Sequence, residues 1–173
     1  MSMPSRTLVS VDEYLHTSYN PDCDYVDGAI VGRNVGELDH SDLQGEIVVY
    51  FRSRLRSRSV YAFPELRVQV GTSRFRIPDV CVVAGSKPSE QILTKPPLIA
   101  IEILSKDDSM PETQERIDDY LKFGVPYVWV INPRTQRAWA YTKDGSHEVA
   151  DGMLRTENPE IELPLPEIFQ ALQ

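Results

Sequence analysis

Two carboxylates stand inside apolar stretches of strand length in this 173-residue chain. Asp79 interrupts residues 76–83, which read RIPDVCVV, and Glu102 interrupts residues 98–105, which read LIAIEILS. Removing an ionised carboxylate from water is costly unless a cation or several hydrogen-bond donors meet it. Because the two stretches are close enough in sequence to form neighbouring strands, they predict a shared partner. A divalent metal ion is the simplest candidate, since Mg²⁺ binds one or two protein carboxylates and keeps water ligands for chemistry.

Phosphodiester hydrolysis is the chemistry that such a pair predicts. A Mg²⁺ (or Mn²⁺) ion held by Asp79 and Glu102 would activate water and stabilise the charge that develops on a phosphoryl group. Glu46 is a candidate third carboxylate, because it borders the apolar stripe of a helix predicted over residues 39–58 and would point over the sheet. The alternative for Glu46 is an ordinary boundary residue paired with an arginine.

Composition indicates one globular domain spanning residues 1–173. The chain is 41% hydrophobic and 25% charged, and its apolar runs are too short for a membrane-spanning helix. The first residues lack the apolar core of a signal peptide. Cys23 and Cys81 have no metal-ligand spacing. We therefore expect a cytoplasmic protein with reduced thiols and no membrane partner.

The charge is unevenly distributed. A formal net charge of −8 argues against a protein that coats nucleic acid nonspecifically. Residues 52–76, however, contain seven arginines and a single acid, Glu65. This arginine-rich stretch predicts a phosphate-binding face that includes Arg52, Arg56 and Arg76. The alternative is a solvated helix face followed by a strand edge.

The order of predicted elements gives an α/β sandwich with a mixed sheet. Hydrophobic periodicity and capping signals predict helices over residues 7–18, 39–58, 109–123 and 165–172, with a short helical piece at 89–93. Alternation and turn signals predict strands over residues 25–31 (a hairpin around Asp27-Gly28), 60–70, 75–83, 98–104, 127–131 and 137–141. Pro78 requires an edge, a bulge or a strand start at that point.

Several short motifs follow one another in a fixed order: Tyr25-Val-Asp-Gly28, His40, Pro78-Asp79, Glu102-Ile-Leu-Ser105, Arg116-Ile-Asp-Asp-Tyr120, Gly124-Val-Pro126, Tyr127-Val-Trp-Val-Ile131 and Pro133. Over nearly its whole length the chain resembles the PD-(D/E)XK nuclease superfamily, and within it the Uma-type family of proposed restriction endonucleases. The resemblance implies a restriction-endonuclease-like core, with a mixed β-sheet flanked by helices. It also implies a Mg²⁺-dependent endonuclease that hydrolyses DNA.

The resemblance assigns roles to individual residues. Asp79 and Glu102 would be the metal carboxylates, and the backbone carbonyl of Ile103 would be a further ligand. A basic residue is expected to position the attacking water. The superfamily places a lysine two residues after Glu102, where this chain has Leu104. The Uma-type family places it four residues before a tyrosine, where this chain has Arg116.

Arginine supplies charge and hydrogen bonds but cannot deprotonate, so Arg116 would act electrostatically and not as a general base. Lys106 is the nearby lysine that could substitute, and a solvated loop charge is the alternative for it. His40 is a candidate phosphate contact, with a helix cap as the alternative. The ring of Tyr120 is expected to pack inside, with its hydroxyl near the acidic cluster.

Three hypotheses follow. The first is a metal-dependent DNA endonuclease, which is expected to be a homodimer because cleaving two strands with one site per chain favours two-fold symmetry. The second is a catalytically impaired binding module that keeps the metal pocket. In the third, Asp79 and Glu102 are internal counter-ions for Arg76 and Arg116. The position of the two carboxylates relative to each other decides whether the first two are possible.

Overall fold

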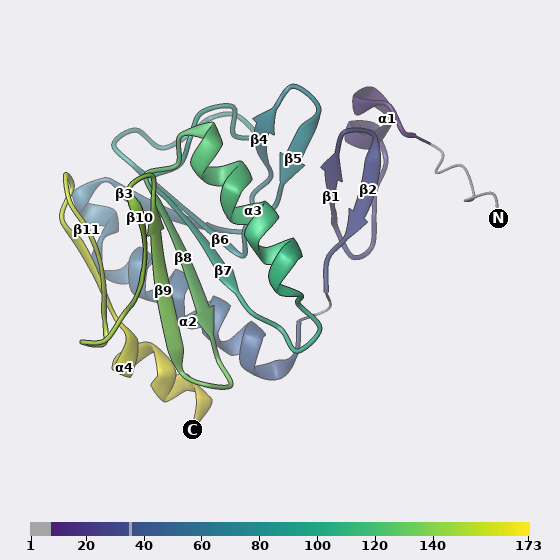
Figure 1. The fold of residues 1–173 in the computed structure, drawn as a ribbon. Helices are drawn as coiled ribbons and strands as arrows, with labels where there is room; N and C mark the ends of the chain where they lie inside the picture. The colour runs from purple at the N-terminus through teal and green to yellow at the C-terminus, as the bar shows by residue number, and fades with distance from the viewer. Residues whose placement is uncertain (1–7, 35) are drawn as a thin grey trace.

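A mixed six-stranded sheet forms the centre of the molecule (Figure 1). The computed structural model describes residues 8–34 and 36–173. The strand order is β10-β9-β8-β7-β6-β3, in which β7 and β8 are parallel and the other neighbours antiparallel. The bounds are β3 (Val60–Pro64), β6 (Val80–Ala84), β7 (Ile99–Ile103), β8 (Tyr127–Asn132), β9 (Arg137–Thr142) and β10 (Gly145–Glu148).

Helices cover both faces of this sheet. Every residue of the central strand β7 is buried, as its continuous apolar sequence predicts for a strand covered on both sides. Ile99, Ile101 and Ile103 pack with α2 (Leu38–Arg54) in the main hydrophobic core. Ala100 packs on the other side with α3 (Met110–Phe123). Glu102 alternates with the isoleucines, and it therefore lies on the α3 face.

α3 is the crossover between the parallel strands β7 and β8, and its ends follow the predicted signals. The side chain of Ser109 accepts a hydrogen bond from the backbone N–H of Glu112, which caps the start of the helix. Gly124 ends it with a φ of 105°, a conformation that glycine adopts without steric cost. Figure 1 shows α3 lying across the sheet, with α2 behind it.

A second sheet, of order β2-β1-β5-β4, lies beside α3 together with α1 (Val11–His16) (Figure 1). Its strands are β1 (Cys23–Val26), β2 (Ala29–Gly32), β4 (Val68–Gly71) and β5 (Arg74–Arg76). Asp27 and Gly28, both with positive φ, form the predicted hairpin turn between β1 and β2. The rings of Tyr14 and Tyr25 stack on each other, and Phe75 packs against both at steeper angles, which holds α1 on this sheet.

The C-terminal segment adds the hairpin β11 (Met153–Thr156) and β12 (Ile161–Pro164), then α4 (Leu165–Ile168) and the 3₁₀ turn η2 (Phe169–Leu172). These elements join the core on the α2 side of the sheet. A further 3₁₀ turn, η1 (Arg56–Arg58), follows α2. No helix among the described residues is long and apolar enough to cross a membrane.

Three predicted elements differ from the structure. The predicted strand over residues 60–70 is wrong as a single strand, because Glu65 has a φ of 50° and the chain leaves the large sheet there and continues as β4 in the small one. The predicted strand over 75–83 is likewise divided into β5 and β6, with Pro78 between them. Residues 89–93 form no helix; Leu93 bridges Val68 instead.

Candidate active site

Asp79 lies just before β6, where Pro78 interrupts the chain between the two sheets. The residue is 4% exposed, yet both of its carboxylate oxygens have donors. Oδ1 accepts a hydrogen bond from Arg33 Nη2 at 2.8 Å, and Oδ2 accepts one from the backbone N–H of Ile103 at 2.7 Å. His40 Nε2 lies 3.3 Å from Oδ2. The burial cost of this carboxylate is therefore offset by charged donors from outside the sheet and one donor from β7.

Glu102 occupies the middle of the α3 face of β7 and is also 4% exposed. The hydroxyl of Tyr120 donates to its Oε1 at 2.7 Å, and Arg116 Nε lies 3.2 Å from its Oε2. Burial raises the pKa of Glu102 to about 7, outweighing the opposing effect of the Arg116 charge, and the charge of Asp79 raises it further. The predicted position of Tyr120, ring inside and hydroxyl on the acidic cluster, is confirmed.

Asp79 and Glu102 flank the point where β6 begins to pair with β7. In this antiparallel pairing, Val80 is opposite Ile101. Asp79 comes immediately before Val80 and Glu102 immediately after Ile101, so both residues lie next to the last paired position. The hydrogen bond from the Ile103 N–H to Asp79 ties the two strands together at this point. The backbone next to Glu102 is therefore within hydrogen-bond distance of the Asp79 carboxylate.

Arg116 is held in place by a second carboxylate on the loop after β7. Its Nη2 lies 3.1 Å from Asp108 Oδ1, while Asp108 Oδ2 accepts hydrogen bonds from the backbone N–H and the hydroxyl of Ser105. Burial would raise the pKa of Asp108, but the Ser105 hydrogen bonds and the Arg116 charge outweigh it and hold the pKa below its ordinary value. Asp108 therefore stays ionised and fixes the Arg116 guanidinium beside Glu102.

A polar pocket of about 410 Å³ opens onto Asp79. Arg33 comes to it from the segment after β2, and His40 and Gln44 come from the first turns of α2. Gln44 Nε2 donates to the backbone carbonyl of Asp79 at 2.9 Å. Burial lowers the pKa of His40, but the hydrogen bond and charge of Asp79 raise it more, so its pKa lies above the ordinary value. The pocket therefore presents the Arg33 guanidinium and the His40 imidazole to a ligand, together with the carboxylates of Asp22, Glu65 and Asp79.

The donor set fits a hard divalent cation of the magnesium type. Asp79 and Glu102 supply two carboxylates, and Mg²⁺ sites commonly use one or two carboxylates while keeping several waters. Among the described residues there is no cluster of three or more histidine, cysteine, aspartate or glutamate side chains arranged to hold a metal, so a site built from protein side chains alone is not formed. Guanidinium groups of Arg33 and Arg116 balance the two carboxylates in this structure.

Other sequence-predicted residues make no contact with Asp79 or Glu102 among the described residues. Glu46 is half-buried on α2, and no hydrogen bond or ion pair within the described part of the chain joins it to either carboxylate. Arg52 is exposed in the last turn of α2, about 18 Å along the helix from His40, and Arg56 is exposed in the turn that follows. Lys106 is 57% exposed and pairs with Glu37 at 2.6 Å.

Arg76 is 2% exposed, so its guanidinium does not form part of an exposed phosphate-binding face. Its Nη1 lies 3.0 Å from Asp24 Oδ2, and its Nε donates to Asp119 Oδ2 at 2.7 Å. We refer to Asp24, Arg76 and Asp119 as the Arg76 cluster. It joins β1 and β5 to α3. Of the two counter-ion pairs proposed from the sequence, the structure contains Glu102 with Arg116 but pairs Asp79 with Arg33 and His40 in place of Arg76.

Arg33, Gln44 and Asp108 line or support the site and were not predicted from the sequence. Gln44 follows His40 by four residues, so the helical spacing that places His40 toward Asp79 would also have indicated Gln44. Arg33 and Asp108 lie in segments without regular structure, where no periodicity reports the direction of a side chain.

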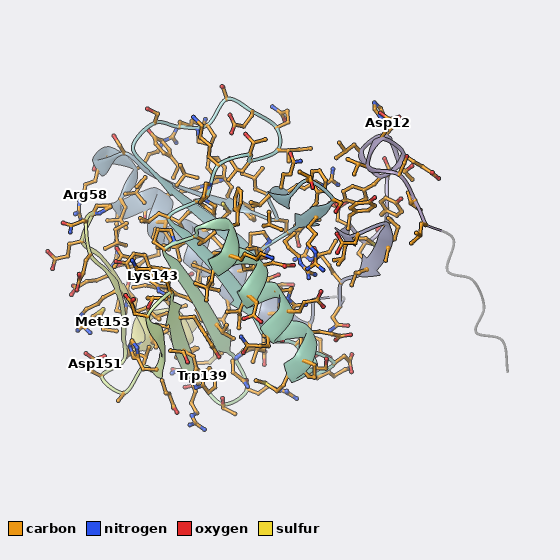
Figure 2. The ribbon with its side chains drawn as sticks, turned by 45° about the horizontal axis from the view of Figure 1, so that its top comes forward. Asp12, Arg58, Trp139, Lys143, Asp151 and Met153 are labelled. Atoms are coloured by element: carbon orange, nitrogen blue, oxygen red, sulfur yellow. The ribbon has the colours of Figure 1, made fainter. Side chains whose placement is uncertain are left out.

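A larger hollow of about 1320 Å³ lies elsewhere, between the end of β9, β10 and β11. Lys143, Asp151 and Met153 line it, and Figure 2 shows these three residues on the side of the molecule away from Asp12 in α1. The buried carboxylates Asp79 and Glu102 are not among its lining residues. The larger of these two hollows is therefore not the one that contains the candidate carboxylate Asp79.

One protein family and a solved structure match nearly the whole chain. The Uma2 family, described as "Putative restriction endonuclease", matches residues 11–173. The chain belongs to the Uma2 family. A crystal structure of "a putative nuclease belonging to DUF820" from Anabaena variabilis is 25% identical in sequence, with a TM-score of 0.82. The match covers 95% of this chain and 99% of that one. No curated protein matches the chain.

The Uma2 match begins at α1 and runs to the last residue, so it includes both sheets and all residues of the candidate site. The family resemblance and the mixed α/β fold predicted from the sequence are confirmed. As a Uma2 member, the chain belongs to a family described by nuclease chemistry, which directs attention to Asp79, Glu102 and Arg116 before the larger hollow.

Proposed function

We propose that this chain is a Mg²⁺- or Mn²⁺-dependent endonuclease that hydrolyses phosphodiester bonds in DNA. One observation carries the proposal: Asp79 and Glu102 are both buried, the backbone N–H of Ile103 next to Glu102 donates to Asp79 at 2.7 Å, and the Arg116 guanidinium lies 3.2 Å from Glu102. Negative groups concentrated in this way favour a cation, and a fixed guanidinium beside them favours a phosphate oxygen.

Asp79 and Glu102 would hold the cation, with the backbone carbonyl of Ile103 as the further ligand that the family resemblance implies. A bound divalent ion would supply an activated water and stabilise charge on the phosphoryl group. The hydroxyl of Tyr120 donates to Glu102, and the backbone N–H of Ile103 donates to Asp79, so each carboxylate is fixed by one hydrogen bond from its surroundings. Such supporting hydrogen bonds typically change metal affinity or activity by about 10- to 100-fold when removed.

Arg116 is the proposed basic residue of the reaction. Its charge is permanent, so it would stabilise the pentacovalent phosphate and would not remove a proton from water. Asp108 and Ser105 prevent the guanidinium from turning away from Glu102. Lys106 is paired with Glu37 in the loop, which argues against it as a substitute. On the pocket side, Arg33 and His40 would bind the non-bridging phosphate oxygens.

A second candidate function is a nucleic-acid-binding module without turnover. Two observations favour it: arginine stands where the Uma-type resemblance implies lysine, and both carboxylates already have internal cationic partners. Under this alternative, the pocket and the metal carboxylates remain but the hydrolytic step is absent.

A plasmid-nicking assay with Mg²⁺ or Mn²⁺ tests the first function against the second. We expect the natural chain to nick supercoiled DNA, and Asp79→Asn to lower the rate by at least roughly 100-fold because a metal carboxylate is lost. Asp144→Asn, the same substitution at an exposed turn, serves as the matched control. Nicking that appears only in Arg116→Lys would show that the natural protein is the non-hydrolytic module.

Calorimetric titration with Mn²⁺ separates both functions from a purely structural role of the carboxylates. We expect binding heat for the natural chain and affinity at least roughly 10-fold weaker for Asp79→Asn. The control is Asp119→Asn, which removes a carboxylate of the Arg76 cluster and is expected to leave the Mn²⁺ affinity unchanged. Equal titrations for all three proteins would mean that Asp79 is a counter-ion only.

A further inference from the structure

Few lysine or arginine side chains near Asp79 are placed to contact the phosphates of a long DNA duplex. Proteins that bind duplex DNA neutralise several phosphates along the DNA backbone with lysine and arginine side chains. Here Arg76 is buried, and Arg74 lies 2.7 Å from Asp119 and 2.8 Å from Asp27. Arg52 lies at the far end of α2. Among the described residues these arginines are therefore buried, paired or distant from the pocket, and the chain as a whole carries a formal net charge of −8.

Arg33 and His40 are the basic residues among the described residues that line the pocket. Both contact Asp79, so a phosphate bound to them would lie next to the proposed metal carboxylates. One guanidinium and one imidazole, both with N–H donors at the same point, suit a single phosphate and not a series of them. The volume of about 410 Å³ is at the small end of the range for ligand sites, roughly 300–1,000 Å³, and matches one small ligand group.

An aromatic ring forms another part of the pocket lining. Tyr19 is half-buried, and its ring stacks on that of Tyr14 with centroids 5.8 Å apart and planes inclined by 29°. Tyr14 is fully buried, so it gives Tyr19 a rigid support. An aromatic side chain that is fixed on one face and lines a polar pocket is the arrangement on which single bases stack.

Amide and carboxylate groups complete the lining. Asn20 and Asp22 are exposed at the pocket next to Tyr19 in sequence, and they offer donors and acceptors of the kind that bind base edges. Asn34, also on the lining, donates to Asp108 Oδ1 at 3.1 Å. Through Asp108 it is linked to Arg116, so the pocket and the proposed reaction centre form one connected network.

We propose that this pocket takes one unpaired nucleotide, with its base on Tyr19 and its phosphate on Arg33 and His40, so that the preferred substrate is single-stranded or frayed DNA. The position of cleavage beside that nucleotide rests on the function proposed above. A base within a duplex enters a pocket of this kind only after it leaves the stack, which costs a few kcal/mol. A single strand presents its bases without that cost.

Fluorescence anisotropy with labelled oligonucleotides tests this without turnover. The probes are a 5′-phosphorylated single strand and the same strand in a blunt duplex, both in EDTA and again with Ca²⁺. We expect the single strand to bind at least roughly 10-fold more tightly than the duplex. Tyr19→Ala is expected to weaken single-strand binding by roughly 10-fold or more, while Tyr19→Phe retains the ring and most of the affinity.

Tyr61→Ala, which removes a half-buried tyrosine on β3 outside the pocket, is the matched control and is expected to bind as the natural chain does. Thermal melting of each variant shows whether it is folded. Equal binding of the two probes, no binding of either, or a Tyr19→Ala variant with full affinity would overturn the proposal. Nicking of duplex plasmid without a preference for single strands would support the nuclease function and reject this inference. Single-strand binding that depends on Tyr19, without any cleavage, would support this inference and reject the nuclease function.

Discussion

The Arg76 cluster and the Asp79–Glu102 site are built from the same residue types, but they differ in their access to solvent. In the Arg76 cluster, a guanidinium with 3% side-chain exposure lies between Asp24 and Asp119 and holds the small sheet on α3. At Asp79, the partners are Arg33 and His40, whose side chains are 16% and 13% exposed and line a pocket. Buried charge indicates chemistry only where a ligand can enter and exchange with the internal partner.

The comparison also shows that a carboxylate within an apolar strand does not by itself predict a metal or catalytic role. Asp24 interrupts an otherwise β-favouring hairpin strand, as Asp79 and Glu102 interrupt theirs. Its Oδ1 accepts a hydrogen bond from the backbone N–H of Ile77, two residues before Asp79, so its role is to fix the path of the chain that leads to the site. The residue type is shared, and the surroundings decide the role.

The largest expected effect is on stability and belongs to the closed cluster. Arg76→Met leaves Asp24 and Asp119 buried without their cation, which should lower the free energy of unfolding by about 3–5 kcal/mol. Arg74→Met is the control, because Arg74 also pairs with Asp119 but its side chain is 31% exposed, and about 1 kcal/mol or less is expected there. Urea denaturation measures both. Equal losses would mean that the cluster is not closed to solvent.

The second effect is a pH dependence that belongs to the open site. The pKa of Glu102 is about 7 in the folded chain against an ordinary value of 4.5. The folded state therefore holds this proton more tightly, and stability should fall by about 3 kcal/mol as the pH rises from 4.5 through 7. Glu102→Gln removes the titrating group and should flatten the curve in that window.

Urea midpoints across pH 4–8 provide the measurement. Burial also raises the pKa of Asp24, so the natural chain and Glu102→Gln must be compared directly. A variant whose stability declines as steeply as that of the natural chain would rule out Glu102 as the source. Because a bound cation favours the ionised carboxylate, Mn²⁺ should reduce the decline in the natural chain.

The smallest effect is expected for the exposed arginines at the end of α2. Arg52→Ala should change the binding of a single-stranded oligonucleotide by less than about twofold, because the residue lies roughly 18 Å of helix from His40. Its stability should change by no more than about 1 kcal/mol, since the lost contacts are one hydrogen bond from Nε to Ala62 O and surface packing. Arg33→Ala is the comparison and should weaken that binding several-fold. An equal loss of oligonucleotide affinity in Arg52→Ala and Arg33→Ala would indicate that the arginine-rich stretch binds nucleic acid.

Regular elements were the easiest part of the fold to predict. The Ser109 cap, the Gly124 stop and the Asp27-Gly28 turn act through neighbouring backbone groups, so the sequence itself carries the information. Two of the three errors occurred where the chain changes sheets. At Glu65 and Pro78 the apolar alternation continues through a bend, and strand periodicity does not record which sheet a residue joins.

Sequence alone identified Asp79 and Glu102 as candidate site carboxylates, Arg116 at the position where the family resemblance implies lysine, and the family itself, because these depend on residue identity and order. Tertiary structure alone decided that Arg33, His40 and Gln44 contact Asp79 and that Arg76 is buried between Asp24 and Asp119. Side chains distant in sequence become partners through the register of β6 on β7 and the packing of α2 and α3, which are long-range contacts that no local pattern encodes.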